Sequence, residues 1–253
     1  QVDLNDGAVW LTRSSEQQVG RLNAQVGELN AAVTTDGKDI DIHQDAQWVL
    51  VRDGSTIVTI DPADVVPVQS SAIPVRATVS MARGVVAVTG QDGALWVRGA
   101  DALGDLAGQA SGDLQLGAGA SAVVSRASGA VLATTAAGEL HRIERDGAVL
   151  SDTVAGRLVG DVRAADEVTA VGDVLVTRTG TVLHTPDAEI DLARYGADFV
   201  LQQPGPASDR VLVAGPGSLI EVPLSGGVPD VHPSGGLGVP AAPVQVAGCG
   251  YAG

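Results

Sequence analysis

Aromatic residues are scarce in this sequence: its 253 residues include three Trp, two Tyr and one Phe. Sugar-binding clefts and the platforms that stack nucleobases are built largely from aromatic side chains. Either kind of site would therefore have little material here. Cysteine is scarcer still, since Cys249 stands alone and supplies neither a disulfide framework nor a CxxC metal site.

Positive charge is also in short supply. Fifteen basic residues against 30 acidic ones give a net charge of −15. A phosphate backbone or an anionic membrane surface would repel such a chain, so we expect no nucleic-acid partner. No apolar run approaches the roughly 18 residues of a membrane-spanning helix, so we expect this segment to be soluble and to make no membrane contact itself.

What the sequence does contain is a repeat. At 45% hydrophobic residues the chain can bury a core. Short Val/Leu/Trp runs recur at intervals of about 40 residues. These runs are Val9–Leu11, Trp48–Leu50, Val85–Val88, Val131–Ala133, Val174–Val176 and Val211–Val213.

A glycine in a turn context follows five of the six runs, and a second apolar stretch and further turn formers come next. The glycines are Gly54, Gly93, Gly138, Gly180 and Gly217. Each can supply the positive φ of a tight hairpin turn. Four short antiparallel strands in every 40 or so residues are typical of a β-propeller blade.

We therefore predict an all-β fold, a single β-propeller domain spanning residues 1–253, with four-stranded antiparallel blades. Six blades are expected at about 1–36, 37–75, 76–117, 118–160, 161–193 and 194–235. Residues 236–253 either close a six-bladed ring or begin a seventh blade, and we favour the seventh blade. In the first blade, Val2–Leu4, Ala8–Thr12, Val19–Leu22 and Glu28–Val33 can serve as the four strands. The stretch Leu22–Val33 could also form a short helix.

The blades lack the Gly-His and Trp-Asp pairs of WD repeats, and the Gly-Gly doublet of kelch repeats does not recur from blade to blade. The stretch Asp6–Arg13, followed by Val19–Asn23, resembles the opening of large membrane-anchored surface proteins of actinobacteria, in which a β-propeller precedes fibronectin type III domains. Residues Ala242–Cys249 are similar to a later point in the same proteins. This resemblance, which covers about residues 2–30 and 240–251, implies an extracellular position at the cell surface, a membrane anchor upstream and fibronectin-like domains downstream. The start at Gln1 rather than Met agrees with an upstream signal peptide or anchor.

The first blade also resembles streptogramin lyases and related propellers. Their repeat has an aromatic-rich strand ending in Thr-Glu, followed by Gly-x-Ile-Gly-Arg-Ile. Here Arg13 stands where the acidic residue would be, and the later blades do not repeat the signature. No catalytic residue is carried over from that family.

Catalytic and metal motifs are absent from the sequence, which has no GxSxG, HExxH, P-loop or EF-hand pattern. We place His43 after a first strand, His141 and His184 in third strands, and His232 in a loop. Because these are different positions within their blades, we interpret the histidines as solvated or packing residues. No catalytic residue, metal or cofactor is predicted.

One recurrence could matter chemically, because an apolar residue followed by Asp opens four candidate innermost strands. The carboxylates are Asp3, Asp41, Asp166 and Asp198. Innermost strands line the channel of a propeller, so a ring of carboxylates could hold a hard cation. The alternative, which we favour, is that each Asp accepts backbone N–H groups and fixes the turn entering its blade.

Two functions follow from these observations. The first, which we prefer, is a non-catalytic extracellular interaction or scaffold module of a bacterial cell-surface protein, monomeric, with an unidentified protein or cell-surface ligand as partner. The alternative is a metal-assisted propeller enzyme similar to a lyase or lactonase. In an extracellular protein Cys249 would be expected to form a disulfide with a cysteine outside the present chain.

Overall fold

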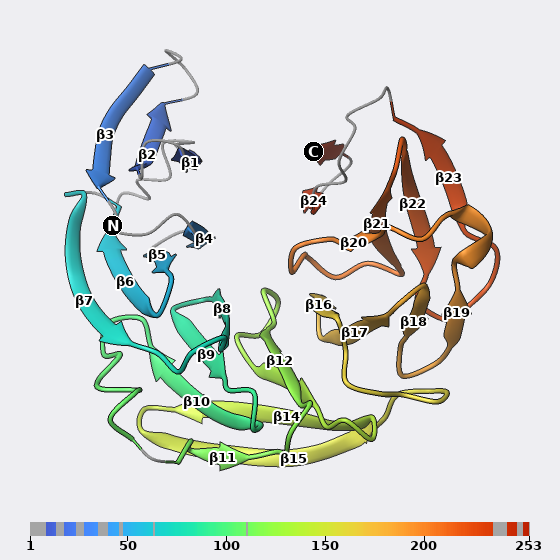
Figure 1. Ribbon diagram of the computed structural model, residues 1–253, viewed down its shortest axis with the longest axis horizontal. Helices are drawn as coiled ribbons and strands as arrows, with labels where there is room; N and C mark the ends of the chain where they lie inside the picture. Colours follow the sequence, from blue (N-terminus) through green and yellow to red (C-terminus); the bar gives the residue numbers. More distant parts are fainter. Residues whose placement is uncertain are drawn as a thin grey trace. The chain divides into compact units, whose positions relative to one another are not determined.

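The computed structural model describes residues 9–13, 18–23, 28–34, 40–45, 48–62, 64–109, 111–234, 242–246 and 250–252 (Figure 1). The chain divides into two compact units. Unit 1 contains Gln1–Gly90 and Trp96–Asp113, and unit 2 contains Gln91–Leu95 and Leu114–Gly253. That the chain forms a single domain remains a prediction. None of the helices in the described ranges has the length and apolar character needed to cross a bilayer.

Antiparallel sheets make up nearly all of the regular structure. The first contains β1 (Val9–Arg13), β2 (Gln18–Asn23) and β3 (Glu28–Thr34), and the second β4 (Ile40–Asp45), β5 (Trp48–Asp53), β6 (Thr56–Asp61) and β7 (Val66–Ala72). The third contains β8 (Thr78–Ala82), β9 (Val85–Thr89), β10 (Ala94–Gly99) and β11 (Leu114–Gln115), and the fourth β12 (Ser121–Val124), β13 (Val131–Thr134), β14 (Glu139–Asp146) and β15 (Val149–Arg157).

The remaining sheets belong to unit 2. The fifth contains β16 (Glu167–Val171), β17 (Val174–Thr179), β18 (Val182–His184) and β19 (Glu189–Asp191), and the sixth β20 (Val200–Leu201), β21 (Arg210–Gly215), β22 (Ser218–Pro223) and β23 (Asp230–Pro233). A short 3-10 helix, η2 (Ala193–Tyr195), lies between these two sheets in the chain. In the tail, β24 (Val244–Val246) pairs with β25 (Gly250–Ala252). That this pair begins a seventh blade remains a prediction.

Within each sheet the strands lie side by side in chain order. The first strands of successive sheets are neighbours: β4 lies beside β8 in unit 1, and β12, β16 and β20 follow one another in unit 2. A four-stranded meander repeated in this way is the blade of a β-propeller. The predicted fold class is therefore confirmed. Residues 28–34 form a strand and not the alternative helix, since they pair with β2.

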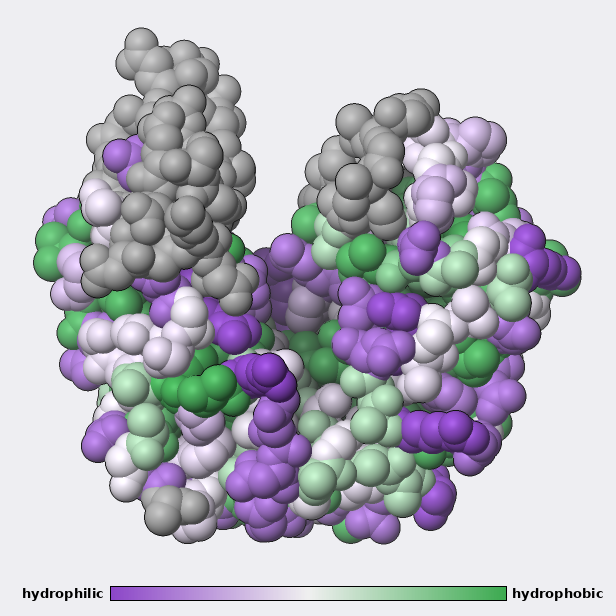
Figure 2. Space-filling model, in the orientation of Figure 1, coloured by the Kyte–Doolittle hydropathy of each residue, from purple (hydrophilic) through white to green (hydrophobic). Residues whose placement is uncertain are grey.

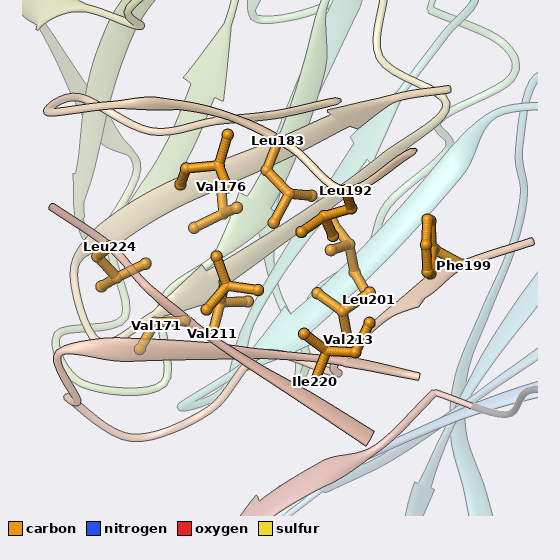
Figure 3. Packing of buried hydrophobic residues seen from close by; sticks show 12 residues of the cluster. Val171, Val176, Leu183, Leu192, Phe199, Leu201, Val211, Val213, Ile220 and Leu224 are labelled. Atoms are coloured by element: carbon orange, nitrogen blue, oxygen red, sulfur yellow. The ribbon is translucent and has the colours of Figure 1, made fainter. Parts of the chain in front are cut away.

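The main apolar clusters lie between the sheets, whereas hydrophobic residues on the face drawn in Figure 2 are scattered in small groups. Figure 3 shows side chains of the fifth and sixth sheets, among them Val176 and Val213, pointing toward one another. Leu175 precedes Val176 in the sequence and packs on the opposite face of the sheet, in a cluster with Leu132 of the fourth sheet. Successive side chains of a strand point to opposite faces. A strand buried on both faces therefore reads as a continuous apolar run, which is why the repeat is visible in the sequence.

The turn between the second and third strands of each four-stranded blade is the most regular part of the repeat. All five glycines expected there have positive φ, from +57° at Gly54 to +82° at Gly138, as predicted. Near each glycine, a turn carbonyl accepts an N–H from a residue just beyond the same blade's outer strand. The pairs are Ser55–Ile73, Gly93–Leu116, Gly138–Leu158, Thr181–Leu192 and Gly217–Ser234, with N···O distances of 2.8 to 2.9 Å. We call this contact the turn latch.

Gly93 shows how close the latch brings the backbone. A Cβ atom on Gly93 would lie 1.8 Å from the carbonyl oxygen of Gly117. No side chain fits there, and φ of +80° would strain any other residue. The glycine signal in the sequence thus marks both a turn and a backbone approach.

We expect Ile220→Ala, in the cluster between the fifth and sixth sheets, to lower the free energy of unfolding by about 2–5 kcal/mol, since it removes buried methylenes and leaves a cavity. Chemical denaturation followed by far-ultraviolet circular dichroism measures the change. Val228→Ala is the control, because Val228 is 76% exposed. Equal effects of the two substitutions would contradict the packing described here.

Candidate functional site

The carboxylates expected on the innermost strands occupy different environments. Asp3 lies outside the described residues. Asp41 is in β4 with its side chain 61% exposed; one oxygen accepts the N–H of Ile42 at 2.9 Å, and the other lies 3.5 Å from Nε2 of His43. Asp198 is exposed and precedes β20 by two residues.

The carboxylates at the start of β16 have a denser set of contacts. Asp166 accepts the N–H of Gly180 at 2.7 Å, in the turn between β17 and β18. Glu167 accepts Nε–H of Arg178 at 2.9 Å and the N–H of Leu201, in the neighbouring blade, at 3.0 Å. Both acidic side chains therefore hold backbone in place, and Arg178 compensates their charge.

The same arrangement of an acid and an arginine occurs in the second blade. Asp41 stands opposite Arg52 in the ladder, as Glu167 stands opposite Arg178. Each arginine precedes the turn glycine by two residues and donates to that glycine's carbonyl, at 3.2 Å for Arg52 and 2.7 Å for Arg178. In register, the counterpart of Asp41 is thus Glu167 and not Asp166.

In the third, fourth and sixth blades, the residue pair that opens the ladder between the first and second strands carries no charge. These pairs are Thr78 with Thr89, Ser121 with Thr134, and Val200 with Ala214. In that first ladder an acid–arginine pair is therefore a feature of two blades among those described. The sequence signal that could have revealed these pairs is an arginine two residues before a turn glycine, in Arg52-Asp53-Gly54 and Arg178-Thr179-Gly180.

The histidines lie on different strands and have different partners. His43 is within β4 itself, not after the first strand, and His232 lies in the outer strand β23, not in a loop; both expected placements were wrong. His141 and His184 are in third strands, as predicted. His184 is buried, with Nδ1 2.9 Å from the carbonyl oxygen of Val159.

His141 is flanked by two carboxylates, with Nδ1 3.0 Å from Asp152 and Nε2 3.2 Å from Glu139. This links β14 to the outer strand β15. Among the residues that the structure describes, no group of three or more His, Cys, Asp or Glu side chains is arranged to hold a metal ion. Cys249 lies outside the described residues.

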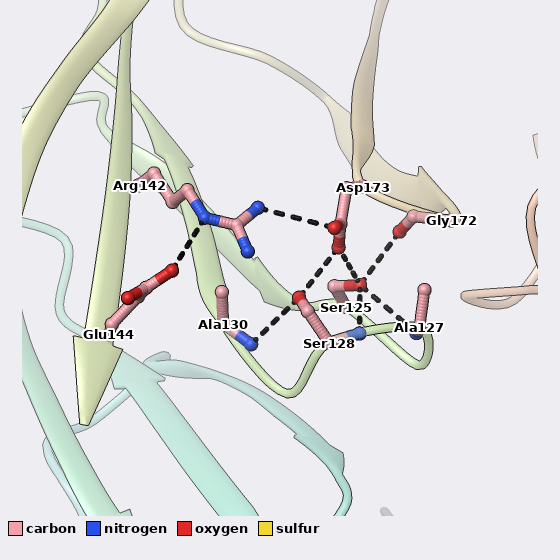
Figure 4. A network of polar contacts seen from close by, with 8 residues as sticks. All are labelled: Ser125, Ala127, Ser128, Ala130, Arg142, Glu144, Gly172 and Asp173. Carbon is pink, nitrogen blue, oxygen red and sulfur yellow. Dashed lines mark hydrogen bonds and ion pairs between the residues drawn. The ribbon is translucent and has the colours of Figure 1, made fainter. Parts of the chain in front are cut away.

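A polar network joins the first hairpins of the fourth and fifth sheets (Figure 4). The Ser125 hydroxyl lies 2.5 Å from a carboxylate oxygen of Asp173 and 2.8 Å from the carbonyl oxygen of Gly172. Ser128 donates to the same carboxylate at 2.6 Å, and Nη1 of Arg142 lies 3.3 Å from its other oxygen. Asp173 is thus held from one strand, β14, and from the first hairpin turn of the preceding blade.

These contacts continue along the first hairpins of unit 2. The N–H of Gly172 donates to the carbonyl oxygen of Gly205 at 3.1 Å, and the N–H of Gln203 donates to that of Pro243 at 3.0 Å. A Cβ on Gly172 would lie 2.8 Å from Cα of Ala207, so the close approach requires glycine. The network and these two bonds connect the fourth, fifth and sixth sheets and the tail. The role of these contacts is structural, because every group in them bonds to another part of the protein.

The fold is shared with several solved structures at low sequence identity. A dihydro-heme d1 dehydrogenase, NirN, solved with DHE is 12% identical with a TM-score of 0.59, over 96% of this chain and 56% of NirN. The β-propeller domain of Myceliophteria thermophila Cps50 (Swd1) is 11% identical with a TM-score of 0.57, over 92% of this chain and 84% of that one.

KlAtg21, solved in complex with the coiled coil of AgAtg16, is 11% identical with a TM-score of 0.59, over 89% of this chain and 76% of that one. At these identities the similarity establishes the β-propeller fold alone. No family model and no curated protein matches the chain.

Asp173 gives the network a pH dependence. Partial burial by itself raises the pKa of Asp173, but hydrogen bonds from Ser125 and Ser128 and the charge of Arg142 outweigh it and lower the pKa below its ordinary value of 3.8. A lowered carboxyl pKa stabilises the fold above the ordinary value, and this stabilisation is lost as pH falls through the folded-state pKa.

We expect Asp173→Ala to cost about 1–2 kcal/mol at pH 7, because charged hydrogen bonds are removed from a partly exposed site. The difference from the unsubstituted protein should disappear as the pH falls below 3.8. Urea titrations at several pH values measure it. The exposed Asp64→Ala is the control, and a cost at Asp173 that does not change with pH would contradict the assignment.

His43 should affect stability in weakly acidic solution. Burial lowers the pKa of His43 from 6.5; Asp41 opposes this shift and Arg52 adds to it. Below pH 6.5 the unfolded chain takes up a proton that the folded chain resists, so stability falls until the folded-state pKa is reached. We expect His43→Gln to flatten the stability profile below pH 6.5, with His232→Gln measured in parallel. An unchanged slope in His43→Gln would refute this role.

Proposed function

We propose that this chain is a non-catalytic interaction or scaffold module at the outer surface of a bacterial cell. The observation that carries the proposal is the hydrogen bonding of the charged side chains at the start of β16 and in β17. Asp166 and Glu167 accept backbone N–H groups, and Arg178 is shared between them and a turn carbonyl. Hydrogen bonds of this kind position backbone within and between blades, which is the use expected of charge in a structural module.

Two further observations support an interaction role. Each four-stranded blade is held at one end by its own latched turn, which leaves the other loops and the outer strands as the variable surface. KlAtg21, which has a similar fold, was solved with a coiled-coil partner, and by analogy protein binding suits this architecture. The extracellular location rests on the resemblance of residues 2–30 and 240–251 to actinobacterial surface proteins and on the net charge of −15.

The decisive experiment separates this proposal from a metal-assisted propeller enzyme. We expect purified protein to contain no stoichiometric divalent ion by elemental analysis and to show no lactonase or lyase turnover above background. One tightly held ion per chain, with turnover lost in Asp41→Ala or Asp198→Ala and kept in Asp64→Ala, would overturn the proposal. Surface labelling of intact cells tests the location, and labelling only after lysis would contradict it.

A further inference from the structure

The outer strand of each blade presents an open edge, and most of these edges are protected. In the second blade β7 contains Pro67, and in the sixth β23 ends in Pro233. The outer strands β11 and β19 have only 2 and 3 residues. Proline and short length are common means of preventing an edge from pairing with another chain.

The outer strand of the fourth blade lacks both protections. β15 has 9 residues with no proline and no lysine, and all of them except Leu150 are exposed. Val149 and Val154 are 69% and 58% exposed. Within the described residues no further strand pairs with β15, which is the last strand of its sheet (Figure 1).

The register shows which backbone groups are free. Asp146 and Val149 close a two-residue hairpin whose first turn residue, Gly147, has φ of +58°. The pair that closes such a hairpin exchanges its hydrogen bonds, and bonded and non-bonded pairs then alternate along the ladder. Leu150, Asp152 and Val154 therefore direct their N–H and C=O groups toward the open edge.

The edge is held in an extended form before any partner arrives. β15 pairs with β14 in one register from Val149 to Val154 and, after a register shift between Leu140 and His141, again at Gly156 and Arg157. Asp152 contacts His141 at 3.0 Å, and Arg157 donates to the carbonyl oxygen of Ala137. A strand already ordered loses little conformational entropy on binding. Its row of unpaired groups is thus available at low cost.

We propose that β15 binds an extended segment of a partner protein by β-strand addition, and that this segment combines β-branched residues with lysine or arginine. The proposal rests on the proposed function and names the surface through which it operates. Backbone groups of Leu150, Asp152 and Val154 supply the affinity, and Val149, Thr153 and Val154 favour β-branched neighbours.

Charge determines which strand is accepted. The chain carries a net charge of −15, so its field attracts a basic segment and repels an acidic one. A second copy of this chain carries the same −15, and edge-to-edge pairing of two β15 strands would work against that repulsion. The favoured occupant is therefore a basic strand and not another β15.

The test uses two nine-residue fluorescent peptides, one alternating Val with Lys and one alternating Val with Glu. We expect the Lys peptide to bind by fluorescence anisotropy and to protect the amides of Leu150, Asp152 and Val154 from hydrogen exchange. The Glu peptide should bind at least about tenfold more weakly, and added salt should reduce the difference.

Three variants locate the binding. Val154→Pro removes an outward N–H without removing a bond of the β14–β15 ladder, and should weaken binding by about tenfold or more. If that variant fails to fold, Val154→Lys blocks the edge by charge instead. Val68→Lys, on the proline-containing β7, adds the same charge at a similarly exposed valine and should retain most of the affinity.

The proposal is overturned if the Lys peptide does not bind, if Val154→Pro and Val154→Lys bind it as well as the unsubstituted protein, or if both peptides bind equally. If sedimentation shows a dimer that Val154→Lys abolishes, the edge binds a second copy of this chain. That result would overturn the proposal that a basic segment of another protein binds there. None of these outcomes bears on the metal and turnover measurements, so failure here is distinguishable from failure of the proposed function.

Discussion

Burial of both faces of the second strand in each four-stranded blade is the constraint on which the rest of this structure depends. A blade has too little surface of its own to bury its side chains, so each sheet needs a neighbour on either side. Leu175 and Val176 show this directly, because adjacent residues of β17 pack into different clusters. Since removal of apolar area from water is the dominant favourable contribution to folding, stability is distributed over the interfaces between blades.

Polar groups supplement this packing where the apolar interfaces end. Ser125 and Asp173 join neighbouring first hairpins, and Glu167 joins one inner strand to the next through the N–H of Leu201. A buried backbone group without a partner is costly, so contacts of this kind fix the register in which two blades meet. Apolar packing supplies the affinity between blades, and the polar contacts supply its specificity.

The sequence predicted those parts of the fold that depend on local chemistry. Strands buried on both faces appear in the sequence as uninterrupted Val/Leu runs, and turns that require positive φ appear as glycines. Both kinds of element could therefore be predicted. β15 was harder to recognise, because a strand exposed on its outer side needs no apolar pattern, and its sequence includes Asp152 and Gly156. His232 was assigned to a loop because Pro233 follows it, yet an outer strand tolerates a terminal proline.

The candidate site was less predictable because it depends on register between strands. The recurring Asp could be read along the chain, but whether it meets an arginine depends on the neighbouring strand, as Glu167 and Arg178 show. A shift of one residue reverses the face to which a side chain points. This is why Asp166, chosen by sequence, and Glu167, matched by register, differ by one position.

The turn latch makes the two ends of a blade unequal in their tolerance of change. The turns it holds are short and similar in every four-stranded blade. The connections between third and fourth strands are not held in this way and range from residues 147–148 to residues 100–113. Because loop closure entropy rises only slowly with length, those connections can accept inserted sequence at small cost. Insertions made by recombination or loop grafting should therefore be tolerated best in these connections, at one end of the blades. The latched turns at the other end keep the strands of each blade in place.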